Sequence, residues 1–498
     1  MKQRSFTRLL RIVRREEGQA LPWMVFLMVL FLGMAGLTLD LGRAYVCYRE
    51  LQASADAAAL AGANELGNPD STVASVKAAA MAYSSASGSL NANGNFSSIT
   101  VTPTPTCFAS LNAKGLLCAA TATGNNGLTV VESGTLPTYL IQALQAFGLN
   151  PSNGLTLNAQ SSATVVGGPN DQYNIALVID TTASMGGSDG GTNCSGSKIS
   201  CALGGVQTLL QYLTPCTVDT GGNSKAKCTA FDTVSMFTFP NVTASTASKD
   251  TTCPTSNPTI QNYYAPVPGS TWSAPTGSSA TYQITTFLND WSSTNSWNAP
   301  LSTSSTLSIA AGASGSSKCG GLQTPGGVST YYAGAIYAAQ ASLMAQQALN
   351  PTTKNAIILL SDGDAQSTDI TIPKTTYKAG STVTATDGTT MNFNVTYPAT
   401  TNECQQAIDA ASNAKAQGTR MIVIGYGAST SGCSKDTSGP LKGISPCTTL
   451  KTMASSASDF YSDKTGSCPG KSSTTLNGIF KAITYSFTTS RLVPNTTT

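Results

Sequence analysis

The sequence of 498 residues contains no histidine, and only 10% of its residues are charged. Histidine is the most frequent general base in enzymes and a frequent zinc ligand, so its absence argues against hydrolases that need a serine–histidine pair. The thirteen cysteines include no C-x-x-C spacing, which argues against zinc ribbons and thioredoxin-like folds. We therefore expect a protein that is not an enzyme, and the length favours two or three domains.

The few charged residues are unevenly distributed. Residues 1–17 contain six basic and two acidic side chains, which leaves 21 basic and 22 acidic residues in the rest of the chain. Nucleic-acid-binding proteins usually carry clustered basic residues on one face, and the body of this chain has no such excess. We therefore expect no nucleic acid among its partners.

An uncharged apolar stretch of 22 residues, 18–39, follows this basic segment. It is long enough to cross a bilayer as a helix, and the basic side of such a helix lies in the cytoplasm. We predict a cytoplasmic tail over 1–17, a transmembrane helix over 18–41 and an extracytoplasmic location, periplasm or cell surface, for the rest. The alternative is a cleaved signal peptide with Ala53-Ser54-Ala55 as its small-residue site. The length of the apolar region and the distance to that site favour a retained single-pass anchor.

Cysteine usage agrees with a location outside the cytoplasm. Cys47 lies on the expected membrane-proximal helix, whereas the other twelve cysteines fall in expected loops or at the ends of elements. An even number of such cysteines is typical of a disulfide framework in an oxidising compartment. Connectivity cannot be deduced from spacing alone, but the short loops favour Cys107–Cys118, Cys194–Cys201, Cys216–Cys228 and Cys433–Cys447.

Residues 42–168 are expected to continue the helix and to add a small α+β module. The alanine-rich stretch 42–66 contains good helix formers. A helix is also predicted over residues 134–149, and alternation of apolar and polar residues predicts strands over 97–106, 116–123 and 155–166. A helix followed by a few antiparallel strands is a pilin-like arrangement. A linker is expected at 167–170.

Several short motifs along this first segment occur in a fixed order. They are Gly18 after the charged cluster, Asp40-Leu41-Gly42 at the expected membrane exit, Leu51-Gln52, and the run 56–61 of sequence DAAALA. Together they resemble the N-terminal segment of the TadG-like family of Tad (Flp) pilus-assembly proteins. The resemblance implies a role in pilus assembly and protein partners such as pilus components. Trp23 stands where type IV prepilins carry a glutamate, which argues against cleavage by a prepilin peptidase.

From residue 171 to about residue 490, apolar strands alternate with amphipathic helices. This alternation is typical of an α/β domain with a mostly parallel sheet covered on both faces. The expected strands are 173–180, 231–239, 355–364, 420–427 and 459–463. The expected helices are 199–213, 330–349, 403–417, 448–457 and 476–489.

The stretch YNIALVIDTTASM, residues 173–185, suggests a binding site at the end of a buried strand. An apolar run ends at Asp180, and the hydroxyl residues Thr182 and Ser184 follow it at alternate positions. Ligand sites in α/β sheets lie beyond the carboxyl ends of the strands. One carboxylate and two hydroxyl groups at such an end form an oxygen ligand set that suits Mg²⁺ or Ca²⁺.

Two later positions complete this set. Asp362 follows a second apolar strand, and Thr330 begins a helix after a glycine-rich turn. The five residues together resemble the metal-ion-dependent adhesion site of von Willebrand factor A domains, whose fold is Rossmann-like. Thr182 replaces the first serine of the family motif, and Ser329 is an alternative to Thr330. The resemblance implies a divalent cation held by Asp180, Thr182, Ser184, Thr330 and Asp362, with an open position for a carboxylate of a partner.

Each of these residues also has a simpler interpretation, since Asp180 and Thr330 can cap helices and Asp362 can belong to a turn. Their joint order favours the metal site. We interpret Asp189 and Asp364, which lie nearby in sequence, as solvated loop acids.

Two insertions, residues 241–325 and 365–401, follow strand ends and are expected on the face of the metal site. The first contains three tryptophans, Trp272, Trp291 and Trp297. Exposed tryptophans are frequent at binding hot spots, but the same residues can equally pack a core of the insertion itself.

Two functions follow from the sequence. The first is a membrane-anchored pilus-assembly or adhesion protein that binds a partner through a divalent cation. The second is a scaffold of the pilus machinery without metal-dependent binding.

Overall fold

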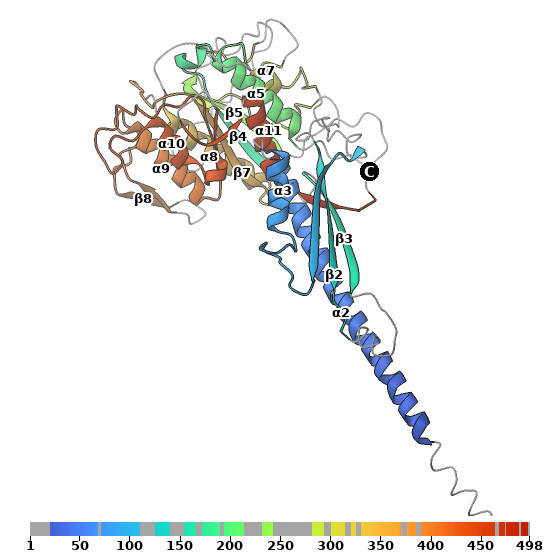
Figure 1. Ribbon diagram of the computed structural model, residues 1–498. Coiled ribbons are helices and arrows are strands. Elements are labelled where there is room, and N and C mark those ends of the chain that lie inside the picture. Colours follow the sequence, from blue (N-terminus) through green and yellow to red (C-terminus); the bar gives the residue numbers. More distant parts are fainter. Residues whose placement is uncertain are drawn as a thin grey trace, which may run out of the picture.

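A computed structural model gives the architecture of the chain (Figure 1). Among the described residues, an elongated part, called the stalk here, contains two helices and a four-stranded sheet, and a larger part, the head, contains a seven-stranded sheet. The described residues are 20–67, 71–109, 125–139, 154–165, 172–189, 194–213, 232–242, 281–292, 300–313, 320–324, 330–368, 370, 376–384, 390–463, 468–473, 475–487 and 490–496.

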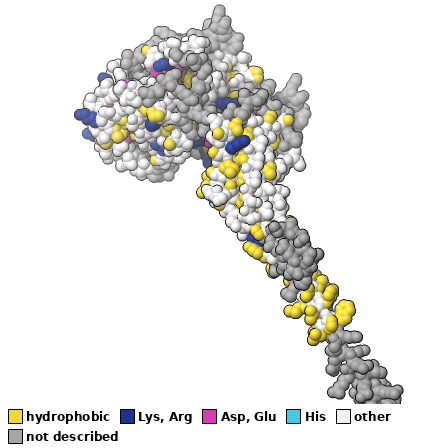
Figure 2. All heavy atoms as spheres, in the orientation of Figure 1, with side chains coloured by type: hydrophobic (Ala, Val, Ile, Leu, Met, Phe, Trp, Pro, Cys, Tyr) yellow, Lys and Arg dark blue, Asp and Glu magenta, His cyan; other side chains and the backbone are white. Residues whose placement is uncertain are grey.

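Helix α2, Ala20–Leu66, is 47 residues long and runs through the stalk and beyond it (Figure 1). At 1.5 Å per residue it spans about 70 Å. Its large apolar side chains from Leu21 to Leu41 are exposed, and they form the apolar surface at the protruding end of the molecule (Figure 2). Among the described residues, this one helix is long and apolar enough to cross a membrane, a test that an N-terminal signal sequence also passes.

The stalk sheet packs against the second half of α2 and has the order β1-β2-β3-β13 with antiparallel pairing. Its strands and the short helix α3 are β1 (Ser98–Thr106), β2 (Gly127–Leu136), β3 (Leu155–Thr164), β13 (Arg491–Val493) and α3 (Val73–Ala82). The strands predicted over 97–106 and 155–166 are confirmed. The helix predicted over 134–149 is wrong at its start, since 134–136 end β2, and residues 140–149 lie outside the described part. The strand predicted over 116–123 also lies outside it.

The head sheet has the order β12-β11-β10-β7-β4-β5-β6, and every neighbouring pair is parallel except β5 with β6. Its strands are β4 (Tyr173–Asp180), β5 (Thr233–Val242), β6 (Thr281–Gln283), β7 (Lys354–Ser361), β10 (Arg420–Gly425), β11 (Phe460–Asp463) and β12 (Lys471–Ser473). The prediction of a mostly parallel α/β sheet is confirmed. Strand order reverses between β4 and β7, and the carboxyl ends of two such strands flank the crevice where ligands bind in α/β sheets.

Helices cover both faces of the head sheet, because the side chains of each buried strand alternate between two cores. Ile175, Leu177 and Ile179 of β4 pack with α5 (Lys198–Tyr212) and α11 (Leu476–Phe487). Ala176 and Val178 pack on the other face. The helices of that face are α8 (Tyr332–Leu349), α9 (Glu403–Ala416) and α10 (Pro446–Met453). The helix predicted over 448–457 begins and ends earlier, because Pro446 occupies its first turn and the Ser445 side chain caps it.

Parts of the two predicted insertions belong to the head. The first contributes β6 to the sheet and the short helix α7 (Thr306–Ala310), and its Trp291 is buried with its indole N–H donating to Leu210 O at 2.9 Å. Trp291 therefore packs the head core instead of forming a recognition surface, while Trp272 and Trp297 lie outside the described part. The second insertion contains the hairpin β8 (Ser381–Thr384) and β9 (Thr390–Phe393).

Three disulfides join described residues of the head. The predicted Cys194–Cys201 bond is confirmed. The predicted Cys433–Cys447 bond is wrong, since Cys433 pairs with Cys404 and Cys447 pairs with Cys468. The Cα atoms of these two pairs are 6.1 and 5.5 Å apart, within the reach of a disulfide. The predicted pairs Cys107–Cys118 and Cys216–Cys228 include residues outside the described part.

Candidate functional site

The residues predicted to bind a metal lie at the carboxyl edge of the head sheet. Asp180 is the last residue of β4, and the short 3₁₀ helix η2 (Ala183–Gly186) places Ser184 over that edge. Asp362 directly follows β7, the strand next to β4. The two carboxylates thus come from adjacent parallel strands at the topological switch point, which is where the sequence argument places them.

Close contacts between oxygen atoms connect four of the five predicted residues into one row. Thr182 donates to Asp180 Oδ1 from its backbone N at 2.9 Å and from Oγ1 at 2.6 Å. Its Oγ1 also lies 3.1 Å from Ser184 Oγ, and Ser184 Oγ donates to Asp362 Oδ1 at 2.7 Å. The alternate spacing of Asp180, Thr182 and Ser184 in sequence therefore becomes a row of oxygens that ends at the second carboxylate.

Asp180 is completely buried, and its Oδ2 accepts a 2.5 Å hydrogen bond from Ser361 Oγ. Burial, reinforced by the nearby carboxylate of Asp362, raises the pKa of Asp180 to about 6, although hydrogen bonds from Ser361 and Thr182 oppose the shift. At neutral pH Asp180 is therefore mostly ionised, but its negative charge is held in a place where a cation would stabilise it.

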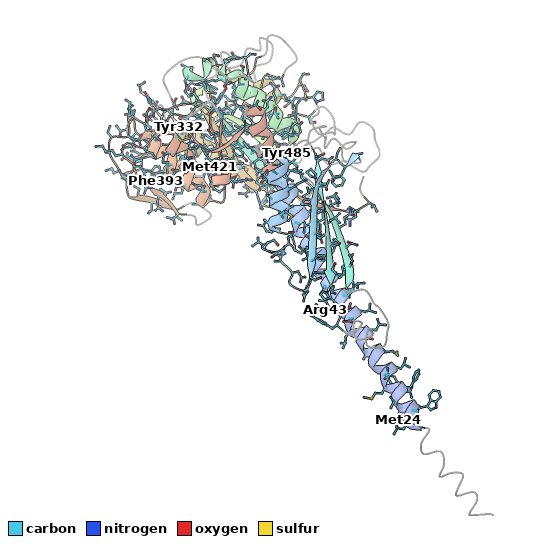
Figure 3. All side chains as sticks on the ribbon, viewed as in Figure 1. Met24, Arg43, Tyr332, Phe393, Met421 and Tyr485 are labelled. Atoms are coloured by element: carbon cyan, nitrogen blue, oxygen red, sulfur yellow. A yellow bond between two sulfur atoms is a disulfide. The ribbon has the colours of Figure 1, made fainter. Side chains whose placement is uncertain are left out.

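Thr330 lies beside this row and is 7% exposed. A Cβ atom added to Gly363 would lie 3.6 Å from Thr330 Oγ1 and 4.0 Å from Ser184 Oγ, so both hydroxyls border the same point next to Gly363. The hydroxyl of Tyr332, labelled in Figure 3, donates to the carbonyl of Gly363 and fixes this turn. The structure thus places Thr330 beside the turn that follows Asp362. Ser329 lies outside the described part.

Lys198 was not among the residues predicted from the sequence. Its Nζ lies 2.5 Å from Asp362 Oδ2, and the Asp362 side chain is only 2% exposed. Lys198 is the first residue of α5, where a positive charge opposes the helix dipole. That unfavourable position is the one signal in the sequence by which a specific role for this lysine could have been recognised.

A count of protons tests whether this oxygen set fits a cation. With both carboxylates ionised, Thr182 and Ser184 supply one hydroxyl proton each. The row contains three close contacts, which are Asp180–Thr182 at 2.6 Å, Thr182–Ser184 at 3.1 Å and Ser184–Asp362 at 2.7 Å. Two protons cannot serve three contacts, so one pair of oxygens faces each other with lone pairs only. Hard cations such as Mg²⁺ and Ca²⁺ bind oxygens of this kind, so the residues fit the predicted group.

Asp189 and Asp364, interpreted as solvated loop acids, lie in loops and are partly exposed. Each also has a protein partner: Asp189 accepts a hydrogen bond from the hydroxyl of Tyr426, and Asp364 accepts one from Gln366 Nε2 at 2.6 Å. Asp189 fixes the loop before α5 against the end of β10. These partners explain the two residues without a ligand.

Comparisons with known proteins give weak structural likenesses over part of the chain and a family match at its start. No curated protein matches the chain. Two crystal structures of the pilus adhesin SpaC from Lactobacillus rhamnosus GG align with 72% of this chain and 32% of theirs, at 12% identity and TM-scores of 0.34 and 0.33. This chain thus spans about a third of the length of that adhesin.

The human COPII-coat protein Sec24c aligns over 72% of this chain and 46% of its own, at 10% identity and a TM-score of 0.24. Residues 18–65, which form most of α2, match the family model described as "Putative Flp pilus-assembly TadE/G-like".

Proposed function

We propose that this chain is a membrane-anchored protein of a pilus system that binds a protein partner outside the cytoplasm through Mg²⁺ or Ca²⁺. In this proposal α2 is the anchor, and the head is a domain of the von Willebrand factor A type. The cation is held by Asp180, Thr182, Ser184, Thr330 and Asp362. The partner is a pilus component or a surface ligand that offers a carboxylate, and the chain has no catalytic role.

The observation that carries the proposal is the shortage of protons in the row of oxygens. Asp180, Thr182, Ser184 and Asp362 make three close contacts with two hydroxyl protons available. With both carboxylates ionised, Thr182 Oγ1 and Ser184 Oγ therefore face each other at 3.1 Å with lone pairs, and a bound cation would stabilise this arrangement. The position of this row at the switch point between β4 and β7 also supports a binding site.

A bound divalent cation would balance the two carboxylates and would leave a coordination position for an acidic group of the partner. The residues of the chain prepare for that role. Ser361 and the backbone N of Thr182 fix the carboxylate of Asp180 from two sides, and η2 holds Ser184 toward Asp362. Tyr332 fixes the turn at Gly363. The ligand atoms are therefore held in place before a partner arrives.

The family match at residues 18–65 supports the pilus context and the role of α2 as an anchor. The exposed apolar side chains from Leu21 to Leu41 support the same role, since they would face lipid. Disulfides in the head support a location outside the cytoplasm, because such bonds persist in oxidising compartments.

The test is a calorimetric titration of the full-length chain in detergent micelles with Mg²⁺, Ca²⁺ and Mn²⁺. We expect saturable binding that is lost in Asp180→Asn, which keeps the shape of the side chain but removes its charge. At a hundred times its dissociation constant, the bound ion should add about 2.7 kcal/mol to the free energy of unfolding.

Asp459→Asn is the matched control, because Asp459 is also a buried carboxylate but lies before β11, at the opposite edge of the sheet, in an ion pair with Arg420. It should bind the ions as the wild type does. A folded wild-type chain that binds none of the three ions would contradict the proposal.

One observation favours the second candidate, a scaffold of the pilus machinery without metal-dependent binding. Lys198 already compensates the charge of Asp362 at 2.5 Å. In a scaffold this ion pair would be permanent, and the head would serve only as a packing unit. Binding of a partner with equal affinity in EDTA and in Mg²⁺ would favour this candidate.

A further inference from the structure

Lys198 occupies the carboxylate that the proposed metal site needs. Its Nζ contacts Asp362 Oδ2 at 2.5 Å, while Asp362 Oδ1 accepts from Ser184. Both oxygens of Asp362 are thus engaged, one by a cation from the protein itself.

The loop before α5 holds Lys198 in this position. Lys198 N donates to Gly187 O at 2.9 Å, and Ser188 and Ser197 form an isolated β-bridge across the loop. The Cys194–Cys201 disulfide spans the same residues, from four positions before Lys198 to three after it. A lysine at the first position of a helix is disfavoured by the helix dipole. The hydrogen bond, the β-bridge and the disulfide therefore hold the positive charge of Lys198 at a position that helix formation alone does not favour.

We propose that Lys198 is a built-in cation that competes with the divalent ion for Asp362. This inference rests on the proposed function and concerns the regulation of the same site. With Lys198 on Asp362, the two carboxylates of the site carry one compensating charge and the folded head is stable without metal. Binding of a divalent ion requires Lys198 to leave.

The physical reason for competition is charge repulsion across a short distance. An ion that uses Asp362 would lie within a few ångströms of an ammonium group bound to the same carboxylate, and like charges repel strongly at such distances in a partly buried site. The Lys198 side chain is 26% exposed and has a flexible four-carbon stem, so its ammonium group can turn into solvent. Lys198 therefore lowers the affinity of the site and sets the ion concentration at which it fills.

The experiment compares Mg²⁺ affinity of the full-length chain in detergent micelles for the wild type, Lys198→Met and Lys198→Arg. We expect Lys198→Met to bind Mg²⁺ at least tenfold more tightly and to melt at a lower temperature than the wild type when EDTA is present. Lys198→Arg keeps the charge and should bind near the wild-type level. Lys378→Met, which removes an exposed lysine on the loop before β8, should bind as the wild type does.

A second measurement uses the wild-type chain and does not depend on the folding of a variant. The rate at which an amine-reactive reagent modifies Lys198, followed by mass spectrometry, should rise severalfold when Mg²⁺ saturates the protein, while the rate at Lys378 stays constant. An unchanged rate at Lys198 under saturating Mg²⁺ would overturn the inference.

The outcomes separate this inference from the proposed function. Equal or weaker Mg²⁺ binding by Lys198→Met than by a wild type that binds would overturn the inference and leave the function standing. Binding by Lys198→Met alone would support the inference and contradict metal binding by the native chain. Absence of binding in both proteins would overturn both.

Discussion

Buried carboxylates are prominent in a chain in which so few residues are charged. In the stalk, Glu132 of β2 is fully buried, and the hydroxyls of Ser54 and Ser85 donate to it. In the head, Asp180 is equally buried but shares its site with Asp362 and Lys198. Burial raises the pKa of both Glu132 and Asp180, because a charged carboxylate is poorly solvated inside a protein. The two carboxylates differ in their partners. Hydroxyl groups donate to both oxygens of Glu132. Asp180 instead belongs to a row of oxygens that has fewer protons than contacts.

Glu403 allows a direct test of such burial away from the candidate site. It is fully buried at the start of α9. Ser367 N donates to its Oε2 at 2.6 Å. Its Oε1 has no hydrogen-bond partner among the residues that the structure describes. Burial raises its pKa from 4.5 to about 7, opposed by the Ser367 hydrogen bond and by Lys435, and supported by Asp436 and Asp364. Below about pH 7 the protonated form is therefore the more stable one in the folded protein.

Because the folded pKa is raised, this stabilisation is complete below pH 4.5 and is lost as the pH rises through about 7. The loss amounts to about 3 kcal/mol at most. Glu403→Gln imitates the protonated form, so we expect it to melt at a higher temperature than the wild type at pH 8 and to lose this advantage at pH 4.5. Melting curves of both proteins between these values measure the difference. A constant difference across the range would contradict the prediction.

At the level of single residues, the sequence predicted the members of the site that are adjacent in the chain or end a strand. Asp180, Thr182 and Ser184 follow one another, and Asp362 ends a second apolar strand. Lys198 was missed because its contact with Asp362 spans 164 positions in sequence and depends on how a loop folds back.

Cys433 was paired with the wrong partner because short loops were favoured. Doubling a loop costs only about 0.6 kcal/mol in closure entropy, so the fold decides the pairing.

Among the elements, α2 has two faces with different residues. Its buried face toward the stalk sheet consists of small or medium side chains at spacings of three and four, namely Ala44, Cys47, Leu51, Ala55, Ala58, Ala59 and Ala63. Small residues allow a helix to approach a sheet closely. Ala58 and Ala59 of the motif 56–61, which contributed to the family resemblance, lie on this packing face, so these two alanines have a physical cause.

Gly62 takes this close approach to its limit. A Cβ added at Gly62 would lie 2.2 Å from Leu128 Cδ2 and 3.2 Å from Ala80 Cβ, and both neighbours are fully buried. Gly62→Ala should therefore destabilise the stalk by about 1–3 kcal/mol, as overpacked cores do. Gly42→Ala is the control in the same helix, because nothing lies within 4 Å of its added Cβ. It should be neutral or gain up to about 1 kcal/mol from helix propensity.

Thermal melting of the two glycine variants in detergent micelles measures these effects. If both alanines changed the melting temperature alike, the close contact between α2 and β2 would be refuted.

The sequence predicted elements where the pattern is local and failed where it is not. Strands β4, β7 and β10 are apolar runs that need no partner to be recognised. Strand β2 was overlooked because its sequence, GLTVVESGTL, places a glutamate and two glycines in a strand. The glutamate is accommodated only by Ser54 and Ser85, which come from α2 and from the segment after α3. Residues distant in sequence thus create the environment that makes β2 a strand.

At the scale of the whole molecule, the chain enters the head from β3 and returns beside it. After α11 closes the head, β13 pairs with β3 in the register Arg491↔Thr164, Leu492↔Ala163 and Val493↔Ser162. Tyr485 of α11, labelled in Figure 3, packs against the core between α2 and the stalk sheet. The head is therefore attached to the stalk through two neighbouring strands. Three residues at the end of a chain carry almost no sequence signal, which is why this strand was not predicted.

Removal of residues 491–498 tests whether the return strand joins the two parts. Without β13, the edge of β3 loses its partner strand, and the contact of Asn495 Nδ2 with Gln160 O at 2.8 Å is also lost. We expect amide hydrogen exchange at residues 162–164 of β3, which pair with β13, to become about tenfold faster, the factor that about 1.4 kcal/mol of local stability represents. Exchange in β4 and β7 should not change, because the head sheet keeps all its strands.

Removal of residues 494–498 is the matched control, since it leaves β13 in place and deletes only the segment after it. Its β3 amides should exchange more slowly than those of the longer deletion. If the two deletions gave equal exchange in β3, the pairing with β13 would contribute nothing to the stalk. The connection between head and stalk would then depend on Tyr485 and on the chain between β3 and β4. If only the longer deletion accelerates exchange, β13 stabilises the edge of the stalk sheet at β3, the strand from which the chain enters the head.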